Sequence, residues 1–282
     1  MIIIKFSKDL KDYLKKRILP RKFIGFVPTM GALHEGHLSL VKECRKMSQI
    51  SICSIFVNPT QFNNPDDFKR YPKTIEKDIL WLEEAGCDIL FMPDEKEIYF
   101  NKKLREKHYE LGYLETILEG KFRPGHFQGV CQVVERLLNI VEPDYLFIGQ
   151  KDFQQCLVIK RLLELNHKKI ELVICPTLRE NSGLAMSSRN LRFNLKERKI
   201  ASELNRCLLA IKDKLTKNNF PNLKYQAVLQ LEKTGFRVEY LELAKRNNLE
   251  IVTQFKKGEE LVILVAAFLN EVRLIDNLLI KG

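Results

Sequence analysis

A short polar segment near the N-terminus carries residues of the kind that bind phosphate. It contains His34 and His37, three residues apart and flanked by glycines. An apolar run at residues 23–27 precedes it and an amphipathic stretch follows, a pattern that predicts a strand, a tight loop and the start of a helix. At a helix N-terminus the unpaired N–H groups and the macrodipole favour an anion. The spacing therefore predicts that two imidazoles present nitrogen donors to one phosphate.

The same two histidines have two other interpretations. A histidine at the start of a helix can cap it or lie in solvent, and neither role needs a ligand. The pair could instead ligate zinc, but the neighbouring sequence offers no obvious third Cys, His or carboxylate ligand. Gly31 and Gly36 allow positive φ and a close approach of a ligand to the backbone, which favours phosphate.

A second candidate segment contains Ser187, Ser188 and Arg189. Two hydroxyls followed by a guanidinium can hold phosphate oxygens through charge-assisted hydrogen bonds. The segment lies where we expect one domain to give way to another, so it could also close over a bound ligand. A pair of helix-capping serines is the alternative.

Three more polar side chains follow predicted strands. Lys151 lies in a Gly-Gln-Lys-Asp segment between an apolar run and a helical pattern. Because the positive end of a helix repels cations, a phosphate ligand explains this lysine better than the helix does. Gln61 and Gln155 each offer an amide donor and acceptor, which suit a hydroxyl or a carboxylate oxygen. For either glutamine alone, a surface loop is the ordinary role.

A glycine-rich stretch at residues 119–130 contains Arg123 and His126. We expect a polar loop there, followed by a helix at 131–141. Such a loop could line a site or only turn the chain.

Apolar runs that alternate with helical patterns fill the first two-thirds of the chain. The runs lie at residues 23–27, 50–57, 88–92, 145–148 and 170–175. Their alternation with helices predicts a doubly wound, mostly parallel, Rossmann-like α/β sheet. Ligands of such sheets bind beyond the carboxyl ends of the strands, where most of the polar segments fall.

The pattern changes after Pro176. Two helical segments, at 196–216 and 223–234, precede strand-like runs at 238–243, 261–268 and 272–275. We therefore predict two domains, a Rossmann-like domain at 1–176 and a smaller α+β domain at 177–282.

The composition is that of a globular protein with a basic surface. The 282 residues are 45% hydrophobic and 29% charged, with a formal net charge of +11. The cations are spread along helical faces and are not interleaved with aromatic residues, so we interpret them as a solvated surface that attracts anionic substrates. The alternative is a nucleic-acid-binding protein, which would show salt-dependent binding to RNA.

Neither a membrane span nor a signal peptide is expected. The longest apolar run covers only residues 261–269, and Lys5 interrupts the apolar N-terminus. The seven cysteines form no C-x-x-C pair and lie mostly among apolar neighbours, which predicts reduced core thiols. We expect a cytoplasmic protein with no membrane or nucleic-acid partner.

Six segments, in the same order along the chain, together resemble one family. They lie at residues 28–37, 55–62, 123–127, 149–155, 184–190 and 273–277. With these segments the chain resembles the pantothenate synthetases, or pantoate–β-alanine ligases, which have the H-x-G-H sequence of nucleotidyltransferase-type Rossmann domains. The resemblance implies a homodimer that uses ATP, Mg²⁺, pantoate and β-alanine. It also implies two steps, in which pantoate and ATP give pantoyl adenylate and pyrophosphate, and β-alanine then displaces AMP.

The resemblance also implies roles at individual positions. His37 is implied as a proton donor, and we group it with His34 and Lys151 as the catalytic set. Gln61 is implied to contact pantoate and β-alanine, and Gln155 to contact pantoate; the ligands of the metal are not implied. The positions implied for ATP are Met30, Gly31, Ala32, Leu33, His34, Glu35, Gly36, His37, Gly149, Gln150, Lys151, Asp152, Leu178, Met186, Ser187, Ser188 and Arg189.

Other nucleotide-using enzymes share part of this pattern. Aminoacyl-tRNA synthetases and cytidylyltransferases also combine H-x-G-H with a distant serine- and arginine-containing segment, and Gln61 and Gln155 favour the ligases over them. The chain departs from the family pattern at Lys73, where an arginine is usual, and at Asn270, where a glycine is common. Neither position lies in the six segments.

Overall fold

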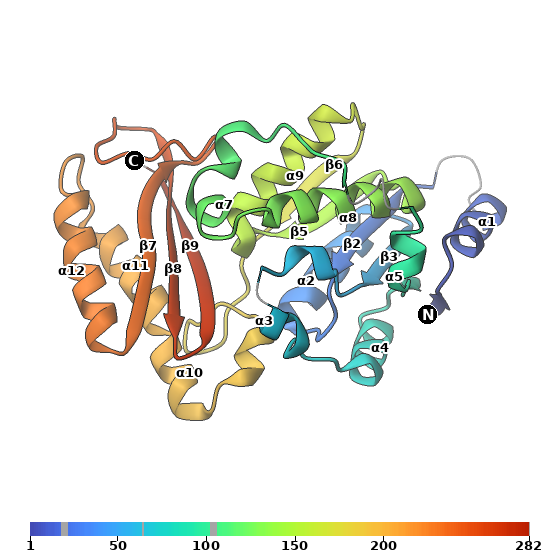
Figure 1. Ribbon diagram of the computed structural model, residues 1–282, viewed down its shortest axis with the longest axis horizontal. Helices are drawn as coiled ribbons and strands as arrows, with labels where there is room; N and C mark the ends of the chain where they lie inside the picture. The colour runs from blue at the N-terminus through green and yellow to red at the C-terminus, as the bar shows by residue number, and fades with distance from the viewer. Residues whose placement is uncertain (18–21, 64, 102–105, 282) are drawn as a thin grey trace. The chain divides into compact units, whose positions relative to one another are not determined.

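The computed structural model describes residues 1–17, 22–63, 65–101 and 106–281. Its chain divides into two compact units (Figure 1). The first unit consists of Met1–Gln150 and Val158–Pro176, and the second of Lys151–Leu157 and Thr177–Gly282.

A parallel sheet forms the centre of the first unit. Among the described residues it has six strands in the order β1-β4-β3-β2-β5-β6, so the predicted doubly wound sheet is confirmed. The short edge strand β1 was not predicted, because Lys5 ends its apolar run after three residues. The strand bounds are β1 Ile2–Ile4, β2 Ile24–Thr29, β3 Ile50–Ile55, β4 Ile89–Phe91, β5 Tyr145–Gly149 and β6 Glu171–Cys175.

Both faces of this sheet are covered, which explains why its central strands are continuous apolar runs. Val27 and Phe147 belong to a buried cluster that includes residues of helix α2, and α2 packs against β2, β3 and β5. Their chain neighbours Phe26 and Leu146, which point to the opposite face, are also fully buried.

The strand order reverses beside β2. From β2 the chain adds β3 and β4 on one side, then returns to add β5 and β6 on the other. The ladder between β2 and β5 covers only Gly25 with Tyr145 and Phe26 with Leu146, near the start of each strand. Such a switch point is where doubly wound sheets bind ligands, beyond the strand carboxyl ends.

Helices and 3₁₀ turns connect the strands. The helices are α1 Ser7–Arg17, α2 Glu35–Met47, α3 Pro65–Lys69, α4 Ile75–Glu84, α5 Glu95–Ile98, α7 Leu118–Phe122, α8 His126–Val141 and α9 Phe153–Leu165. The 3₁₀ turns are η1 Pro59–Gln61, η2 Gly112–Glu115 and η3 Gln150–Asp152.

The polar loop expected at 119–130 is wrong, because most of that stretch is helical. It contains α7 and the first turn of α8, separated by Gly125, whose φ of 77° breaks the helical path. Position 129, inside α8, is a glycine because a Cβ there would overlap the carbonyl of Thr60 in turn η1. Glycine therefore serves close helix packing at this position, and its usual association with loops misled the prediction.

The second unit pairs three helices with an antiparallel sheet in the order β7-β8-β9. The predicted helix at 196–216 is two helices that meet at the fully buried Ser202, whose hydroxyl donates to the carbonyl of Lys199 at 2.7 Å. Asn270 has φ 52° in the two-residue β8–β9 connection, which explains why a glycine is common there. The elements are η4 Ser188–Arg192, α10 Leu195–Ala201, α11 Glu203–Lys214, α12 Phe220–Lys233, β7 Phe236–Lys245, β8 Glu260–Leu269 and β9 Val272–Lys281.

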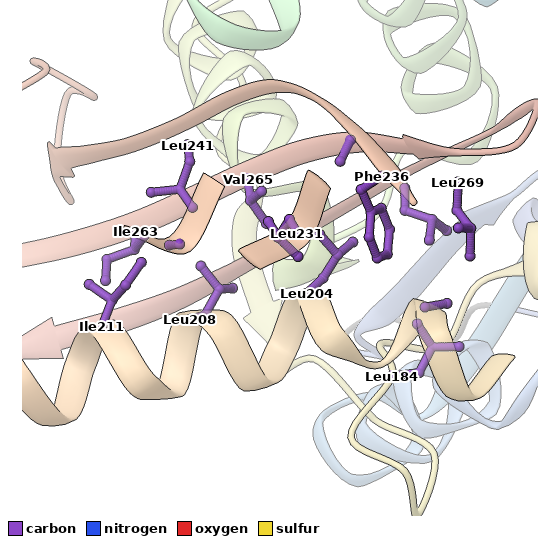
Figure 2. Packing of buried hydrophobic residues seen from close by; sticks show 14 of the residues in the cluster. Leu184, Leu204, Leu208, Ile211, Leu231, Phe236, Leu241, Ile263, Val265 and Leu269 are labelled. Atoms are coloured by element: carbon purple, nitrogen blue, oxygen red, sulfur yellow. The ribbon is translucent and has the colours of Figure 1, made fainter. Parts of the chain in front are cut away.

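A hydrophobic core holds the second unit together. Leu204, Leu208 and Ile211 repeat at helical spacing along α11 and point towards the sheet, where they meet Ile263 and Val265 of β8 (Figure 2). All five side chains are at most 2% exposed. Truncating such a leucine to alanine removes about 2–5 kcal/mol of unfolding free energy, so this core alone stabilises the unit substantially.

The cysteines lie in the cores, as the sequence predicted. Six are buried and Cys207 is half-buried, and none forms a disulfide among the described residues. Burial raises the pKa of Cys44 and Cys175 to about 11, and that of Cys87 and Cys131 to about 12. These thiols therefore stay protonated and unreactive near neutral pH.

Candidate functional site

The two histidines of the first segment lie side by side at the N-terminus of α2. Their ring centroids are 3.9 Å apart, with 31° between the ring planes. The backbone N–H of His34 points to Nδ1 of His37 at 3.4 Å. An acceptor role for Nδ1 leaves the proton of a neutral His37 on Nε2, which can then donate to a ligand.

The first turn of α2 has donors available for an anion. The N–H groups of Glu35 and Gly36 have no acceptor within the described part of the chain. They lie at the positive end of a 13-residue helix that follows β2, next to the switch point of the sheet. Backbone donors, helix dipole and adjacent imidazoles together make this end of α2 suited to phosphate.

A buried carboxylate fixes the loop that leads into α2. Asp78 of α4 is 1% exposed and accepts from the N–H groups of Ala32 and Leu33, each at 2.8 Å. The hydroxyl of Thr74 donates to the same carboxylate at 2.9 Å. Gly31 and Ala32 both have positive φ, so this backbone path depends on the contacts that hold it. Asp78 was not predicted as a site residue, because an acidic residue on an amphipathic helix normally lies in solvent.

Gln61 is held by its backbone, which leaves its side chain to a ligand. It ends turn η1, which Asn58 caps by accepting from Thr60 N–H. The carbonyl of Gln61 accepts from Arg123 at 3.2 Å and from Nδ1 of His126 at 2.8 Å. The side-chain amide forms no hydrogen bond with any described residue, which suits the substrate contact predicted for it.

The hydrogen bonds of His126 define its tautomer. Its Nε2 lies 2.9 Å from Nη1 of Arg123, which can only donate, so Nε2 must be the acceptor. Nδ1 then carries the proton that it donates to Gln61. Arg123 and His126, whose role the sequence left open, therefore position the turn that carries Gln61.

Lys151 lies in η3, in the second unit, where Asn277 in the middle of β9 holds its backbone. Asn277, 2% exposed, donates from Nδ2 to the carbonyl of Lys151 at 2.9 Å. The adjacent Asp276 receives a two-pronged ion pair from Arg179, with contacts of 2.7 and 2.9 Å. The ammonium of Lys151 lies 3.3 Å from the exposed carboxylate of Asp152. Because the carboxylate of Asp152 is 44% exposed, water weakens this ion pair, and a phosphate could replace Asp152 as the partner.

The serine segment is folded back on the chain before it. Met186 N–H donates to the carbonyl of Leu178 at 3.0 Å, which brings these two predicted ATP positions together. Ser187 caps η4, where its hydroxyl accepts from Arg189 N–H at 3.3 Å. This is the capping role weighed as the alternative, and it leaves the hydroxyl proton able to donate to a ligand.

The remaining predicted positions differ in exposure. Met30 and Gly36 are half-buried, Glu35 is exposed, and Ser188 is buried at 6%. Gly149 ends β5 and Gln150 begins η3. Leu178 is 39% exposed. Gln155 on α9 is half-buried, and its side chain has no hydrogen-bond partner in the described residues.

Neither a metal cluster nor a membrane span is found in the described parts of the chain. There, no group of three or more His, Cys, Asp or Glu side chains could hold a metal ion by itself. Likewise, none of the described helices is both long and apolar enough to cross a membrane.

These features define a class of protein, an α/β protein with a helix N-terminus suited to an anion at the switch point of a doubly wound sheet. Comparison with known proteins narrows the class. The family model described as Pantoate-beta-alanine ligase matches residues 2–279. The pantothenate synthetase of Cytophaga hutchinsonii is 42% identical, over 99% of this chain and 99% of its own length. The one from Bacteroides thetaiotaomicron is 39% identical, over 100% of this chain and 99% of its own.

Solved structures agree with the sequence comparisons. The crystal structure of pantothenate synthetase from Thermus thermophilus is similar with a TM-score of 0.85 and 38% identity, covering 99% of both chains. A pantoate-beta-alanine ligase from Francisella tularensis, crystallised with beta-gamma ATP and beta-alanine, has a TM-score of 0.82 and 37% identity, covering 99% of this chain and 97% of that one. The chain belongs to the pantoate–β-alanine ligase family. It is an ATP-dependent ligase that joins pantoate to β-alanine.

Proposed function

We propose that this ligation runs through a pantoyl adenylate, with the N-terminus of α2 as the part of the first unit that binds ATP phosphate. The observation that supports this most directly is the adjacent pair His34 and His37 beside the N–H groups of Glu35 and Gly36, which have no acceptor among the described residues. The Francisella relative crystallised with beta-gamma ATP supports ATP as the nucleotide.

In the first step a carboxylate oxygen of pantoate attacks the α-phosphorus of ATP. The new C–O–P linkage forms as the bond to pyrophosphate breaks, and negative charge grows on the phosphate oxygens. Donors that are already fixed around those oxygens lower this barrier. His37 supplies such a donor at Nε2, and His34 lies against it.

The second unit contributes its own ATP positions in this proposal. Lys151 provides a point charge for phosphate, and its backbone is held by Asn277. Ser187, Ser188 and Arg189 provide two hydroxyls and a guanidinium, which suit phosphate oxygens. Met186 and Leu178 provide packing contacts. We assign the region at 177–282 the role of a lid that shields the adenylate from water.

Mg²⁺ fits this site as a companion of the nucleotide. Mg²⁺ is usually held by one or two carboxylates together with substrate phosphates, so it needs no protein cage. Asp152, an exposed carboxylate next to Lys151, suits that role. When bound, the ion neutralises charge on the phosphates.

In the second step the amine of β-alanine attacks the acyl carbon of the adenylate. An amide bond forms, AMP leaves and the amine loses a proton. Gln61 and Gln155 are our proposed contacts for pantoate, and Gln61 also for β-alanine, since both side-chain amides lack a partner among the described residues. Neither glutamine is a nucleophile, and because the adenylate already activates the acyl carbon, this route requires no covalent acyl-enzyme. We further propose that the protein is a cytoplasmic homodimer. Sedimentation equilibrium would test the homodimer by giving the mass of the assembly in solution.

The residue roles are tested by isotope exchange between pyrophosphate and ATP in the presence of pantoate. This assay reports the first step without β-alanine. Removing one preorganised donor costs about a hundredfold to a thousandfold in the chemical step, so His37→Ala and Lys151→Ala should each lose at least about tenfold. Two exposed residues provide matched controls, His108→Ala and Lys160→Ala, the latter on α9. Near-normal exchange in His37→Ala or Lys151→Ala would remove that residue from the proposed set.

A further inference from the structure

A cavity of about 660 Å³ lies in the second unit, and none of the residues that line it was assigned to ATP or pantoate. It is formed by the C-terminal end of α11, the connection between β7 and β8, and the end of β9. The volume falls within the range of about 300–1,000 Å³ that is usual for small-molecule sites.

Cations dominate the lining of this cavity. They are Lys212, Lys217, Arg246, Lys257 and Lys281. The acidic residue of the lining, Glu260, pairs with Arg246 at 3.1 Å. In the described parts of the chain, none of the four lysines forms an ion pair with a carboxylate. Four like charges around one space repel each other, and an anion bound among them would relieve that repulsion.

The rest of the lining is apolar. Leu215, Phe255, Leu279 and Ile280 contribute to the wall; Ile280 is buried and the other three are half-buried. Phe255 is held in place because its N–H donates to the carbonyl of Lys217 at 3.3 Å. This backbone hydrogen bond links Phe255, on the apolar side of the cavity, to Lys217 on the cationic side.

We propose that this cavity binds a small phosphorylated compound with an aromatic or apolar part. A phosphate monoester carries up to two negative charges, which several lysines can share as point charges. The apolar part would cover Phe255 and its neighbours, a division of roles typical of small-molecule pockets. A nucleic acid fits less well, because the cations surround a cavity with one aromatic residue and do not follow an extended track.

Isothermal titration of the full-length protein with 1-naphthyl phosphate tests this assignment. Inorganic phosphate and 1-naphthol serve as probes that carry only the charge or only the ring. The variant Lys217→Glu/Lys257→Glu reverses two charges of the lining. Lys199→Glu/Lys233→Glu makes the same change of charge on α10 and α12, outside the cavity. All four lysines are exposed, so both variants should fold.

The site predicts a specific set of results. 1-Naphthyl phosphate should bind at least about tenfold more tightly than either partial probe, because charge and apolar surface both contribute. The Lys217→Glu/Lys257→Glu variant should lose at least about tenfold in this affinity, the control less than about twofold, and added salt should weaken binding. Lys151→Ala, which removes a proposed phosphate contact of the nucleotide site, should leave the titration unchanged, and ligase activity should be the same in both double variants.

Four results would overturn the proposal. Equal losses in the two double variants would mean that the probe responds only to net charge. A loss of affinity in Lys151→Ala that Lys217→Glu/Lys257→Glu does not show would place the probe in the nucleotide site. Inorganic phosphate binding as tightly as 1-naphthyl phosphate would remove the apolar part of the ligand. Labelled RNA whose binding depends on Lys217 and Lys257, without binding of the aryl phosphate, would show a nucleic-acid surface instead.

Discussion

The replacement Asp78→Asn tests whether a carboxylate outside the ligand-binding motifs fixes the ATP loop. One oxygen of Asp78 accepts from Ala32, and the other accepts from Leu33 and Thr74. An asparagine keeps the shape but replaces one acceptor with an NH₂ group. If the amide oxygen keeps Leu33 and Thr74, its nitrogen faces the N–H of Ala32, and two donors then meet in a buried place.

The cost follows from the contacts that are lost. A hydrogen bond to a charged group contributes about 1.5–3 kcal/mol, and a buried donor left unsatisfied costs about 1–3 kcal/mol. We therefore expect Asp78→Asn to lower the unfolding free energy by about 3 kcal/mol. The loop carries the backbone into α2, so we also expect at least about a tenfold loss in kcat/KM for ATP, from displaced donors.

Thr74→Ala is the matched control. It removes one hydrogen bond to the same carboxylate but leaves both bonds to the loop backbone, so it should cost only about 1.5 kcal/mol and leave kcat/KM for ATP within about threefold. Urea unfolding and pyrophosphate–ATP exchange measure the two effects. If Asp78→Asn resembles Thr74→Ala in both assays, Asp78 does not position the loop.

Three other changes test separate parts of the account. Gly129→Ala adds a methyl group against turn η1, so KM for pantoate should rise more than KM for ATP; equal changes would mean that Gln61 is not displaced. Asn277→Ala removes the hydrogen bond to the Lys151 carbonyl and should slow pyrophosphate–ATP exchange several-fold, with an unfolding cost of about 1 kcal/mol. An unchanged exchange rate would separate Asn277 from the site. Burial raises the pKa of thiols such as Cys87, to about 12, so the unfolded chain releases their protons first. The contribution of these thiols to the unfolding free energy should therefore be constant below about pH 8.5 and fall as the pH rises towards 12. Urea unfolding midpoints that do not fall between pH 8 and 10.5 would contradict this.

Much of the fold could be predicted from the chain because the parallel strands are long apolar runs. β2, β3 and β5 are buried on both faces, and that burial is visible as continuous hydrophobicity. Errors arose where packing overrides local preference. Helix α8 contains a glycine at position 129 because Thr60 lies against it. The helices α10 and α11 meet at Ser202, whose hydroxyl donates to the carbonyl of Lys199. Neither contact can be seen in a local window of sequence.

The candidate site was likewise predictable only in part from the sequence. The spacing of His34 and His37 at a helix start indicates that they can point the same way, and their rings do lie side by side. Asp78 could not be found this way, because its partners lie 45 and 46 residues earlier in the chain. Asn277 was visible only as part of a motif whose purpose the sequence does not give. Its bond to Lys151 spans 126 positions.

The central claim is that this chain activates pantoate as an adenylate before β-alanine attacks. Labelled pyrophosphate, ATP and Mg²⁺ are incubated with the protein, with and without pantoate, and β-alanine is added in a second stage. The account predicts label exchange into ATP that requires pantoate alone, followed on addition of β-alanine by equal amounts of AMP and pantothenate. Formation of ADP, or exchange that needs β-alanine, would contradict the adenylate.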